Sequence, residues 1–265
     1  MTRLDGAHVL ITGGSQGIGW AFARKAAASG SRVSLVARDA TRLRSAAQAI
    51  GAHWRAADVT DTAALHAAID RLEEDAGPCD ILVCCAGFAL PGRFLANPLD
   101  ELDRQWEVNV RGAAAAAHRV LPGMVSRGRG HVVFTSSTAG VIGVVGYSGY
   151  AATKFAVRGF ADSLRYEVEP AGVRVTVLFP PDTDTPGFAA ENLRKPPETA
   201  AVSGGITPVS PEKVADALSR GIRRNAYTVT ADAGTRALLR FGGALEPVLR
   251  RGFRRTIAKA TDANG

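Results

Sequence analysis

A short apolar run that leads directly into a glycine-rich turn and then a helix constrains this chain more than any other feature. The run His8–Thr12 is short and apolar, as buried strands are. The segment Gly13-Gly-Ser-Gln-Gly17-Ile-Gly19 follows it, and an amphipathic run then ends near Gly30. Glycines let the backbone approach a pyrophosphate closely, and a helix N-terminus favours an anion. The segment therefore predicts a dinucleotide site, with an ordinary glycine turn as the alternative.

Strand-length apolar runs alternate with helix-length segments along most of the chain. The expected strands are residues 7–12, 32–37, 53–57, 80–85, 131–136, 173–179 and 227–230. The expected helices are residues 17–29, 40–50, 63–76, 99–127, 150–169 and 211–224. This alternation predicts an α/β fold: one Rossmann-type doubly wound domain, with a seven-stranded, mainly parallel sheet and helices on both faces. We expect this domain at residues 1–232, with a substrate loop at 180–208 and a basic amphipathic extension at 233–265.

Two side chains with matched chemistry lie one helical turn apart. Tyr150 and Lys154 are four residues apart, so a helix projects both from one face. A free tyrosine has a pKa of about 10, and a neighbouring ammonium favours the phenolate and lowers that pKa. A phenol tuned in this way can exchange a proton with a carbonyl or an alcohol. Ser137 precedes the tyrosine by thirteen residues, and a surface lysine beside a half-buried tyrosine is the alternative interpretation.

The glycine spacing Gly-x3-Gly-x-Gly, taken with Ser137, Tyr150 and Lys154, closely resembles the short-chain dehydrogenase/reductase family from about residue 5 to residue 230. The resemblance implies that Tyr150 donates a proton to the developing alkoxide. It also implies that Lys154 lowers the tyrosine pKa and binds the nicotinamide ribose, and that Ser137 positions the carbonyl oxygen. Asn109 matches the fourth catalytic position, where it would hold a water; an asparagine that bonds the backbone is the alternative. Ser136 is the neighbouring alternative to Ser137.

The end of the second expected strand favours one form of the cofactor. An acid there would bond the ribose 2′-hydroxyl and select NAD, but the strand ends in Ala37 and Arg38 follows. A guanidinium binds a 2′-phosphate through two hydrogen bonds, so NADP(H) is expected. Asp39 is expected to cap the next helix, and a solvated surface arginine is the alternative for Arg38. The cofactor contacts that the pattern and the resemblance predict are Gly13, Ser15, Gln16, Gly17, Ile18, Gly19, Arg38, Asp58, Val59, Ala86, Gly87, Tyr150, Lys154, Pro180, Thr183 and Thr185.

Two segments place the chain within the family. Members commonly have Asn-Asn-Ala-Gly where this chain has Cys84-Cys85-Ala86-Gly87, so a side chain that braces the sheet in relatives is replaced by a thiol. The run 179–188 is similar to that of one branch, the 3-ketodihydrosphingosine reductases. The resemblance therefore implies an NADP-dependent oxidoreductase that transfers hydride to the ketone of an apolar substrate, 3-ketodihydrosphingosine. A steroid or a 3-oxoacyl thioester is the alternative substrate, and a non-catalytic nucleotide-binding protein is a remote alternative.

The net charge of +7 is concentrated near the C-terminus, where residues 236–259 contain seven basic side chains and one acid, Glu246. An apolar stripe runs through the same segment: Leu238, Phe241, Leu245, Leu249, Phe253 and Ile257. Two short helices are expected, because Gly242, Gly243 and Pro247 divide the stripe. The stripe with its arginines is typical of a helix lying in an anionic membrane surface, and packing on the core or on a sister subunit is the alternative.

The apolar stretches, the N-terminus and the cysteine spacing limit where the protein can be located and which partners it can have. No stretch of eighteen apolar residues and no basic leader is present, and Cys79, Cys84 and Cys85 have no metal spacing. We therefore expect a cytoplasmic protein with reduced thiols, no metal and no nucleic-acid partner, and with peripheral membrane contact as an open alternative. The resemblance implies a homodimer or homotetramer formed through helices 99–127 and 150–169.

Overall fold

A seven-stranded parallel sheet forms the centre of the protein. The structure is a computed structural model and describes residues 1–262, apart from the side chains of residues 245, 261 and 262. The strands are β1 (His8–Thr12), β2 (Arg32–Ala37), β3 (His53–Ala56), β4 (Ile81–Cys84), β5 (Gly130–Thr135), β6 (Val173–Leu178) and β7 (Thr228–Val229). Their order is β3-β2-β1-β4-β5-β6-β7, and each neighbouring pair is parallel. The seven expected strands are confirmed, and the sheet is wholly parallel.

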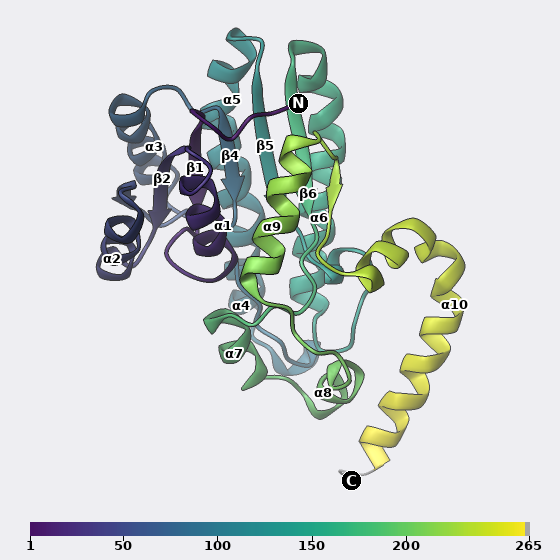
Figure 1. Cartoon of the computed structure of the whole chain (residues 1–265). Coiled ribbons are helices and arrows are strands. Elements are labelled where there is room, and N and C mark those ends of the chain that lie inside the picture. The colour runs from purple at the N-terminus through teal and green to yellow at the C-terminus, as the bar shows by residue number, and fades with distance from the viewer. Residues whose placement is uncertain (263–265) are drawn as a thin grey trace.

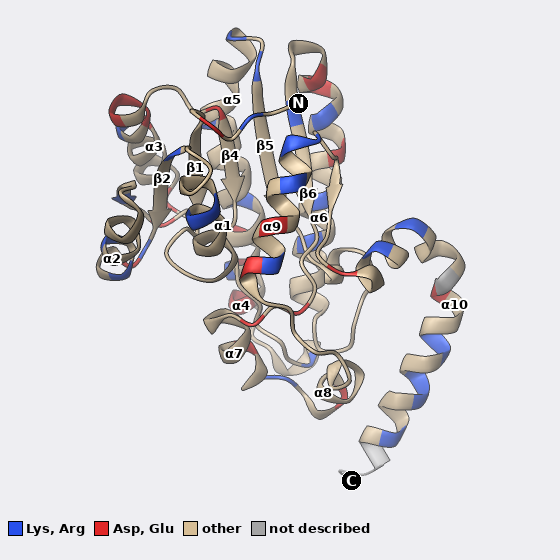
Figure 2. Cartoon of the chain, in the orientation of Figure 1, with Lys and Arg blue, Asp and Glu red and all other residues tan. Residues whose placement is uncertain are grey.

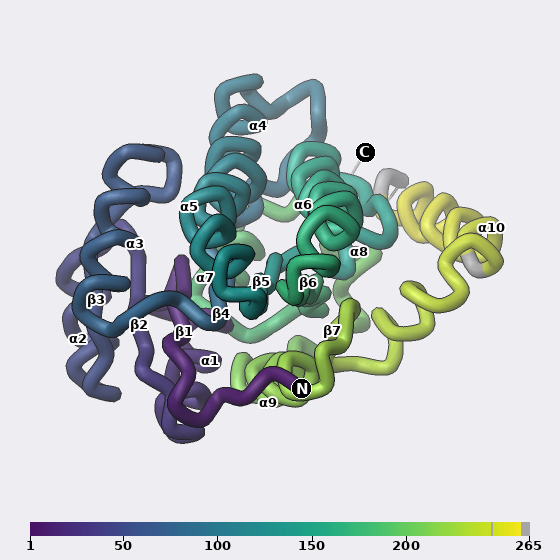
Figure 3. Tube along the Cα trace, turned by 90° about the horizontal axis from the view of Figure 1, so that it is seen from above, coloured from purple at the N-terminus to yellow at the C-terminus, as the bar shows by residue number. Residues whose placement is uncertain are grey.

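Helices cover both faces of the sheet and bury an apolar core on each (Figure 1, Figure 3). One face packs against α1 (Gly17–Ala27), α2 (Ala40–Ile50) and α9 (Pro211–Arg223). The other packs against α3 (Thr62–Ala76), α5 (Gly112–Ser126) and α6 (Ser148–Val168). Strands covered on both faces must be apolar at successive positions, and β1 is buried at all five of its residues. The predicted doubly wound α/β architecture is confirmed.

Side-chain caps fix where several of these helices begin. The Asp39 side chain accepts a hydrogen bond from the Arg42 amide at 2.9 Å, so α2 begins at the next residue, as expected. Ser210 accepts from the Lys213 amide at 3.2 Å, and Pro211 takes the first helical position of α9. These local signals are strong enough to be read from the sequence.

The segment expected as one long helix, residues 99–127, contains a wider turn. Helix α4 (Leu99–Trp106) is followed by a π-helical turn, η2 (Glu107–Arg111), which leads into α5. Asn109 lies in this turn. Such π turns inside α-helices are rare and occur frequently at functional sites.

The stretch 180–208 is not one open loop. It contains α7 (Pro186–Asn192) and α8 (Pro197–Ser203), two short helices that the sequence prediction missed. Thr185 caps α7 by accepting from the Phe188 amide at 3.1 Å, and Pro186 takes its first position. A cap residue followed by proline was therefore a visible signal in a stretch dominated by loop-forming residues.

The C-terminal segment forms one helix rather than the two expected. Helix α10 (Ala233–Asp262) includes Pro247, and Figure 1 draws it bent and extending away from the sheet. It packs against α8, and Figure 2 shows basic residues along its length. Leu245, part of the predicted stripe, lies outside the described side chains. Within residues 1–262, no helix has the length and apolar character needed to cross a bilayer.

Candidate active site

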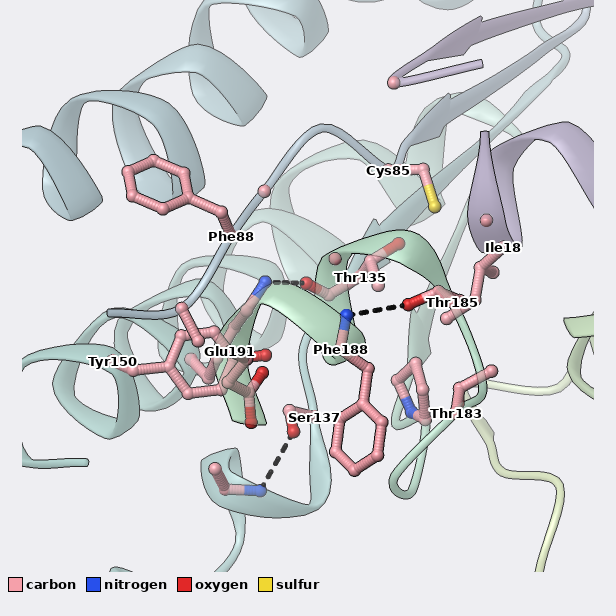
Figure 4. Close-up of a pocket in the computed structure, with 18 of the residues that line it drawn as sticks. Ile18, Cys85, Phe88, Thr135, Ser137, Tyr150, Thr183, Thr185, Phe188 and Glu191 are labelled. Atoms are coloured by element: carbon pink, nitrogen blue, oxygen red, sulfur yellow. Dashed lines mark hydrogen bonds between the residues drawn. The ribbon is translucent and has the colours of Figure 1, made fainter. Parts of the chain in front are cut away.

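A pocket of about 980 Å³ lies at the carboxyl ends of the central strands. Its lining includes residues that follow the ends of the first six strands and residues of several helices, and Figure 4 shows part of this lining. The connections from β1 and from β4 lead to opposite faces of the sheet, and ligands of open α/β sheets bind at such a switch point. The pocket brings together all predicted site residues except Asn109.

The glycine turn between β1 and α1 presents bare backbone to this pocket. A Cβ added at Gly13 would lie 2.7 Å from the backbone nitrogen of Ala86, and one at Gly19 would lie 2.4 Å from the carbonyl oxygen of Gly13. Gly17 has a φ of +57° and begins α1, whose first amide groups have no partners within the helix. This cradle fits the pyrophosphate of a dinucleotide, which would receive those amide hydrogen bonds.

Two arginines line the pocket beyond the end of β2. Arg38 Nη1 lies 3.5 Å from Asp58 Oδ2, and 59% of the Arg38 side chain is exposed. Arg42, one turn further along α2, donates to the side-chain oxygen of Gln16. Burial raises the pKa of Asp58, but hydrogen bonds from Thr60 and the charge of Arg38 outweigh burial and hold that pKa below its ordinary value. Arg38 is thus oriented by an ion pair, and Arg42 is a second guanidinium that the sequence prediction missed.

The start of α6 and the end of β5 bring the predicted catalytic side chains together. Lys154 Nζ lies 5.5 Å from the centre of the Tyr150 ring. Lys154 is 4% exposed and donates to the Thr135 carbonyl at 2.9 Å (Figure 4). The Ser137 hydroxyl accepts from the Ala139 amide at 3.1 Å, and Ser137 lowers the pKa of the Tyr150 phenol. The pair on α6 and the serine therefore meet in the pocket as the spacing predicts.

The neighbouring serine has a different role. Ser136 is 1% exposed, and its hydroxyl donates to the Lys154 carbonyl at 2.8 Å. That bond connects the end of β5 to α6, and it uses the one hydrogen that the Ser136 hydroxyl can donate. The geometry therefore favours Ser137 over Ser136 as the group that meets Tyr150.

Burial governs the protonation of both α6 side chains. It raises the pKa of Tyr150, the charges of Glu191 and Asp182 raise it further, and the hydrogen bond with Ser137 lowers it. Burial also lowers the pKa of Lys154 to about 8. The expected lowering of the tyrosine pKa is not met, because burial is the largest influence on that pKa and raises it. A phenol that keeps its proton at neutral pH can act as a proton donor.

The Asn109 side chain makes three hydrogen bonds within the protein. Its Oδ1 accepts from the Phe88 amide at 3.0 Å. Its Nδ2 donates to the Phe88 carbonyl and to Thr153 Oγ1, both at 3.0 Å. These contacts fix the segment after β4 against α6, immediately behind Gly87. These contacts match the alternative interpretation, an asparagine that bonds the backbone. The water-binding role of Asn109 stays a prediction.

The residues after β6 close another side of the pocket. Thr183 Oγ1 donates to the Pro181 carbonyl at 2.7 Å, and Thr185 caps α7. The Cβ position of Gly17 lies 3.2 Å from the Thr185 methyl group, so this segment packs directly on the glycine turn.

The three cysteines are free thiols. Cys84, which stands where family members have asparagine, donates from its sulfur to the Ala113 carbonyl at 3.6 Å. The thiol therefore keeps a weak contact between β4 and α5. Cys85 lines the pocket, and burial raises its pKa, so it is not a reactive thiolate at neutral pH.

The sequence prediction missed most of the pocket wall that lies away from the glycine turn. Tyr147 donates its hydroxyl hydrogen to Glu191, and Asp182 lies near the same wall. The apolar lining there consists of Val202, Ile206, Leu238, Leu249 and Phe253. Tyr147 precedes Tyr150 by three residues, a spacing that could have revealed it. Glu191 reaches the pocket only because α7 comes close to Tyr147 at the start of α6, and no local sequence signal predicts that contact.

The chain belongs to the short-chain dehydrogenase family, because the model described as short chain dehydrogenase matches residues 7–196. This membership makes the protein an oxidoreductase of alcohol and ketone groups that uses a nicotinamide cofactor.

Particular relatives narrow the similarity further. The chain is 40% identical to a 3-ketodihydrosphingosine reductase of Bos taurus over 80% of this chain and 67% of that protein. It is 34% identical to a protein of the same name from Dictyostelium discoideum, over 92% and 80% of the two chains. A short-chain dehydrogenase from Sphingobium yanoikuyae, solved with NADPH, is 29% identical with a TM-score of 0.78, covering 92% of this chain and 95% of that one. The predicted family resemblance and fold are thereby confirmed.

Proposed function

We propose that the protein is an NADPH-dependent ketoreductase that reduces 3-ketodihydrosphingosine to dihydrosphingosine. Several relatives that match most of this chain are named for that activity. The observation that carries the proposal is the lining of the pocket. One end presents Ser137 and Tyr150, and the other end is an apolar wall between helices α8 and α10.

The apolar wall suits a long hydrocarbon chain. Ile206 follows α8, and Leu249 and Phe253 project from α10 into the same pocket. Burying apolar surface is worth about 25 cal/mol per Å², or roughly 0.8 kcal/mol for each methylene. A substrate with a polar head at Tyr150 and an alkyl chain along α10 would therefore be bound along its whole length.

The residues of the pocket perform the proposed reaction in separate roles. When bound, the reduced nicotinamide supplies the hydride. The Ser137 hydroxyl donates a hydrogen bond to the ketone oxygen and fixes its position beside the tyrosine. Tyr150 keeps its proton until negative charge develops on that oxygen and then transfers it, so the product leaves as an alcohol. Lys154 would hold the nicotinamide ribose through its ammonium, and Asn109 would keep a water beside the lysine that returns the proton.

The two arginines that line the pocket after β2 support NADPH as the form used. Arg38 and Arg42 both line the pocket after β2, where the 2′-phosphate of the adenine ribose would lie. The carboxylate that pairs with Arg38 belongs to Asp58, on the connection after β3 rather than at the end of β2. Guanidinium groups bind phosphate through charge-assisted hydrogen bonds, so this arrangement favours the phosphorylated cofactor.

A panel of ketones tests this function. The purified protein is given NADPH with 3-ketodihydrosphingosine, a steroid ketone and a 3-oxoacyl thioester, and NADPH consumption is followed. We expect the highest kcat/KM for the sphingoid ketone. The thioester is the second candidate, because a 3-ketoacyl-(acyl-carrier-protein) reductase from Brucella melitensis is 26% identical with a TM-score of 0.79, covering 88% of this chain and 99% of that one. Faster reduction of the thioester would replace the proposal by that candidate.

We also propose that α10 (Ala233–Asp262) makes a peripheral contact with a membrane. We propose further that the protein is cytoplasmic and assembles as a homodimer or homotetramer. Basic residues follow the length of this helix (Figure 2), and Phe241 and Val248 on it are 54% and 71% exposed. Part of the predicted stripe, Leu238, Leu249 and Phe253, faces the pocket instead. A helix that lines the substrate pocket and binds anionic lipid would receive a lipid substrate directly from its membrane. The three free cysteines fit a reducing compartment.

A further inference from the structure

Glu191 places a carboxylate in the pocket beside the proposed proton donor, and the proposed mechanism gives it no role. The Tyr147 hydroxyl donates to Glu191 Oε1, and the centres of the Tyr147 and Tyr150 rings are 5.8 Å apart. The charge of Glu191 acts directly on Tyr150, where it is the strongest influence on the pKa after burial. Figure 4 shows the Glu191 carboxyl on the side of the pocket where Tyr150 and Ser137 lie.

The charges around Glu191 leave this end of the pocket with an excess of negative charge. Lys195 Nζ lies 3.6 Å from Glu191 Oε1, and these side chains are only 6% and 15% exposed. The same ammonium stabilises the carboxylate of Asp182, so two acids share one cation. Lys154 directs its own ammonium at the Thr135 carbonyl. Burial raises the pKa of both carboxyl groups because it disfavours their charged forms. A further cation in the pocket would stabilise these two carboxylates.

We propose that Glu191 selects an amino ketone by binding the ammonium group on the carbon next to the substrate carbonyl. This inference rests on the proposed function, because the sphingoid ketone has such an amine, whereas a steroid ketone or a 3-oxoacyl thioester lacks it. The nitrogen and the carbonyl oxygen of an amino ketone are attached to adjacent carbons, so holding one orients the other. Tyr150 and Ser137 bind the oxygen, and Glu191 binds the nitrogen.

The contacts of Glu191 leave one carboxylate oxygen available for this bond. Tyr147 and Lys195 both contact Oε1, so Oε2 is the oxygen that would accept from the substrate. Tyr147 holds the carboxylate in place on α7 while its ring stays beside Tyr150. Binding through a held carboxylate fixes the ketone for attack, which is a gain in positioning as well as in affinity.

A purely structural role for Glu191 makes a different prediction. In that case the bond from Tyr147 to Glu191 serves only to hold α7 (Pro186–Asn192) against α6, and its loss would affect all substrates alike. Glu191→Gln separates the two roles, because the amide oxygen still accepts from Tyr147 while the negative charge is lost. Tyr147→Phe does the reverse, since it removes the bond and keeps the charge. Asp184→Asn is the matched control, because Asp184 is an exposed acid of the same segment that does not line the pocket.

The measurement compares two substrates with each protein. These are the sphingoid ketone and the same long-chain hydroxy ketone without the amine, both with NADPH and in the same detergent micelles. We expect the wild type to favour the amino ketone. We expect Glu191→Gln to lower the ratio of the two kcat/KM values by roughly ten- to a hundredfold, the range for a hydrogen bond to a charged group. Asp184→Asn should leave that ratio near the wild-type value, and Tyr147→Phe should lower it less than Glu191→Gln does, because the carboxylate keeps its charge and loses only the bond that holds it.

Each other outcome is decisive. An equal fall of both kcat/KM values in Glu191→Gln, or an unchanged ratio, overturns the role of Glu191 and leaves the proposed ketoreductase intact. Wild-type protein that reduces neither long-chain ketone overturns the proposed function, and the role of Glu191 fails with it. Wild-type protein that reduces both ketones equally well overturns the amine selection alone.

Discussion

The two ends of the pocket are built in different ways. The end proposed to hold the cofactor, called the cofactor end below, lies on the carboxyl edge of the sheet, where buried hydrogen bonds such as Ser136 to Lys154 connect β5 with α6. The substrate end is formed by α7 (Pro186–Asn192), α8 (Pro197–Ser203) and α10 (Ala233–Asp262), which lie outside the sheet (Figure 1). Changes at the first end should therefore alter the chemistry for all substrates, whereas changes at the second should alter which substrate is accepted.

The largest effect is expected at the cofactor end. Tyr150→Phe keeps the ring but removes the proton donor, so turnover should fall by about 10²–10⁴-fold for every ketone, while NADPH still binds. Single-turnover kinetics and a titration of NADPH fluorescence measure the two properties separately. Turnover close to the wild-type value would remove the tyrosine from the mechanism.

Both arginines should contribute to a preference for NADPH over NADH. Arg38→Ala and Arg42→Ala should each weaken NADPH binding more than NADH binding, and we expect the preference to shift by about ten- to a hundredfold. Arg71→Ala is the control, because Arg71 is an exposed arginine of α3 outside the pocket. Binding titrations with both cofactors check this. A preference that neither variant changes would show that both arginines are surface residues without a cofactor role.

At the substrate end, shortening an apolar side chain should change how kcat/KM depends on the length of the substrate's alkyl chain. Leu249→Ala removes apolar contact from the pocket, so kcat/KM for a long-chain ketone should fall roughly tenfold while that for a short-chain ketone changes little. Val248→Ala is the matched control, since Val248 is the neighbouring residue and is 71% exposed. Equal losses with long and short ketones would contradict a hydrocarbon site along α10.

A smaller effect is expected from the outer surface of α10. Replacing Arg251, Arg254 and Arg255 by alanine should reduce co-sedimentation with anionic vesicles at low salt, at about 1 kcal/mol for each basic residue near the surface. The control replaces Arg3, Arg71 and Arg129, which are exposed arginines of the body. Equal sedimentation of all three proteins would place the membrane contact elsewhere or remove it.

The smallest effect concerns folding stability and pH. Burial holds the pKa of Lys154 at about 8 against an ordinary value of 10.5. Between these pH values the unfolded chain binds more protons than the folded one, so this group makes stability rise as pH increases. Lys154→Met lacks that contribution, so the wild type should gain stability relative to it from pH 8 to pH 10. Urea unfolding at several pH values measures the difference, and a constant difference would contradict the buried ammonium.

The sequence predicted the cofactor end of the pocket well because its signals are local. Strand, glycine turn and helix are neighbours in the chain, and Tyr150 and Lys154 are one turn apart on α6. The capping residues Asp39 and Ser210 also act within three residues of themselves. In each case the spacing along the chain sets the spacing in the structure.

The substrate end was poorly predicted because its contacts join distant segments. Glu191 contacts Tyr147 across forty-four residues, and Leu249 reaches the pocket from a segment expected to lie on a membrane, on the core or on a sister subunit. The pKa of Tyr150 was predicted in the wrong direction for the same reason. The pKa of Tyr150 is raised by burial and by Glu191 and Asp182, whose positions depend on how the stretch after β6 folds.

The most direct test of this account is a structure of the wild-type protein with oxidised cofactor and 3-ketodihydrosphingosine, two ligands that cannot react with each other. We expect the ketone oxygen within hydrogen-bond distance of Tyr150 and Ser137, the ammonium at Glu191, and the alkyl chain along Leu249 and Phe253. A ketone bound with its chain away from α10, or with its oxygen away from Tyr150, would contradict it.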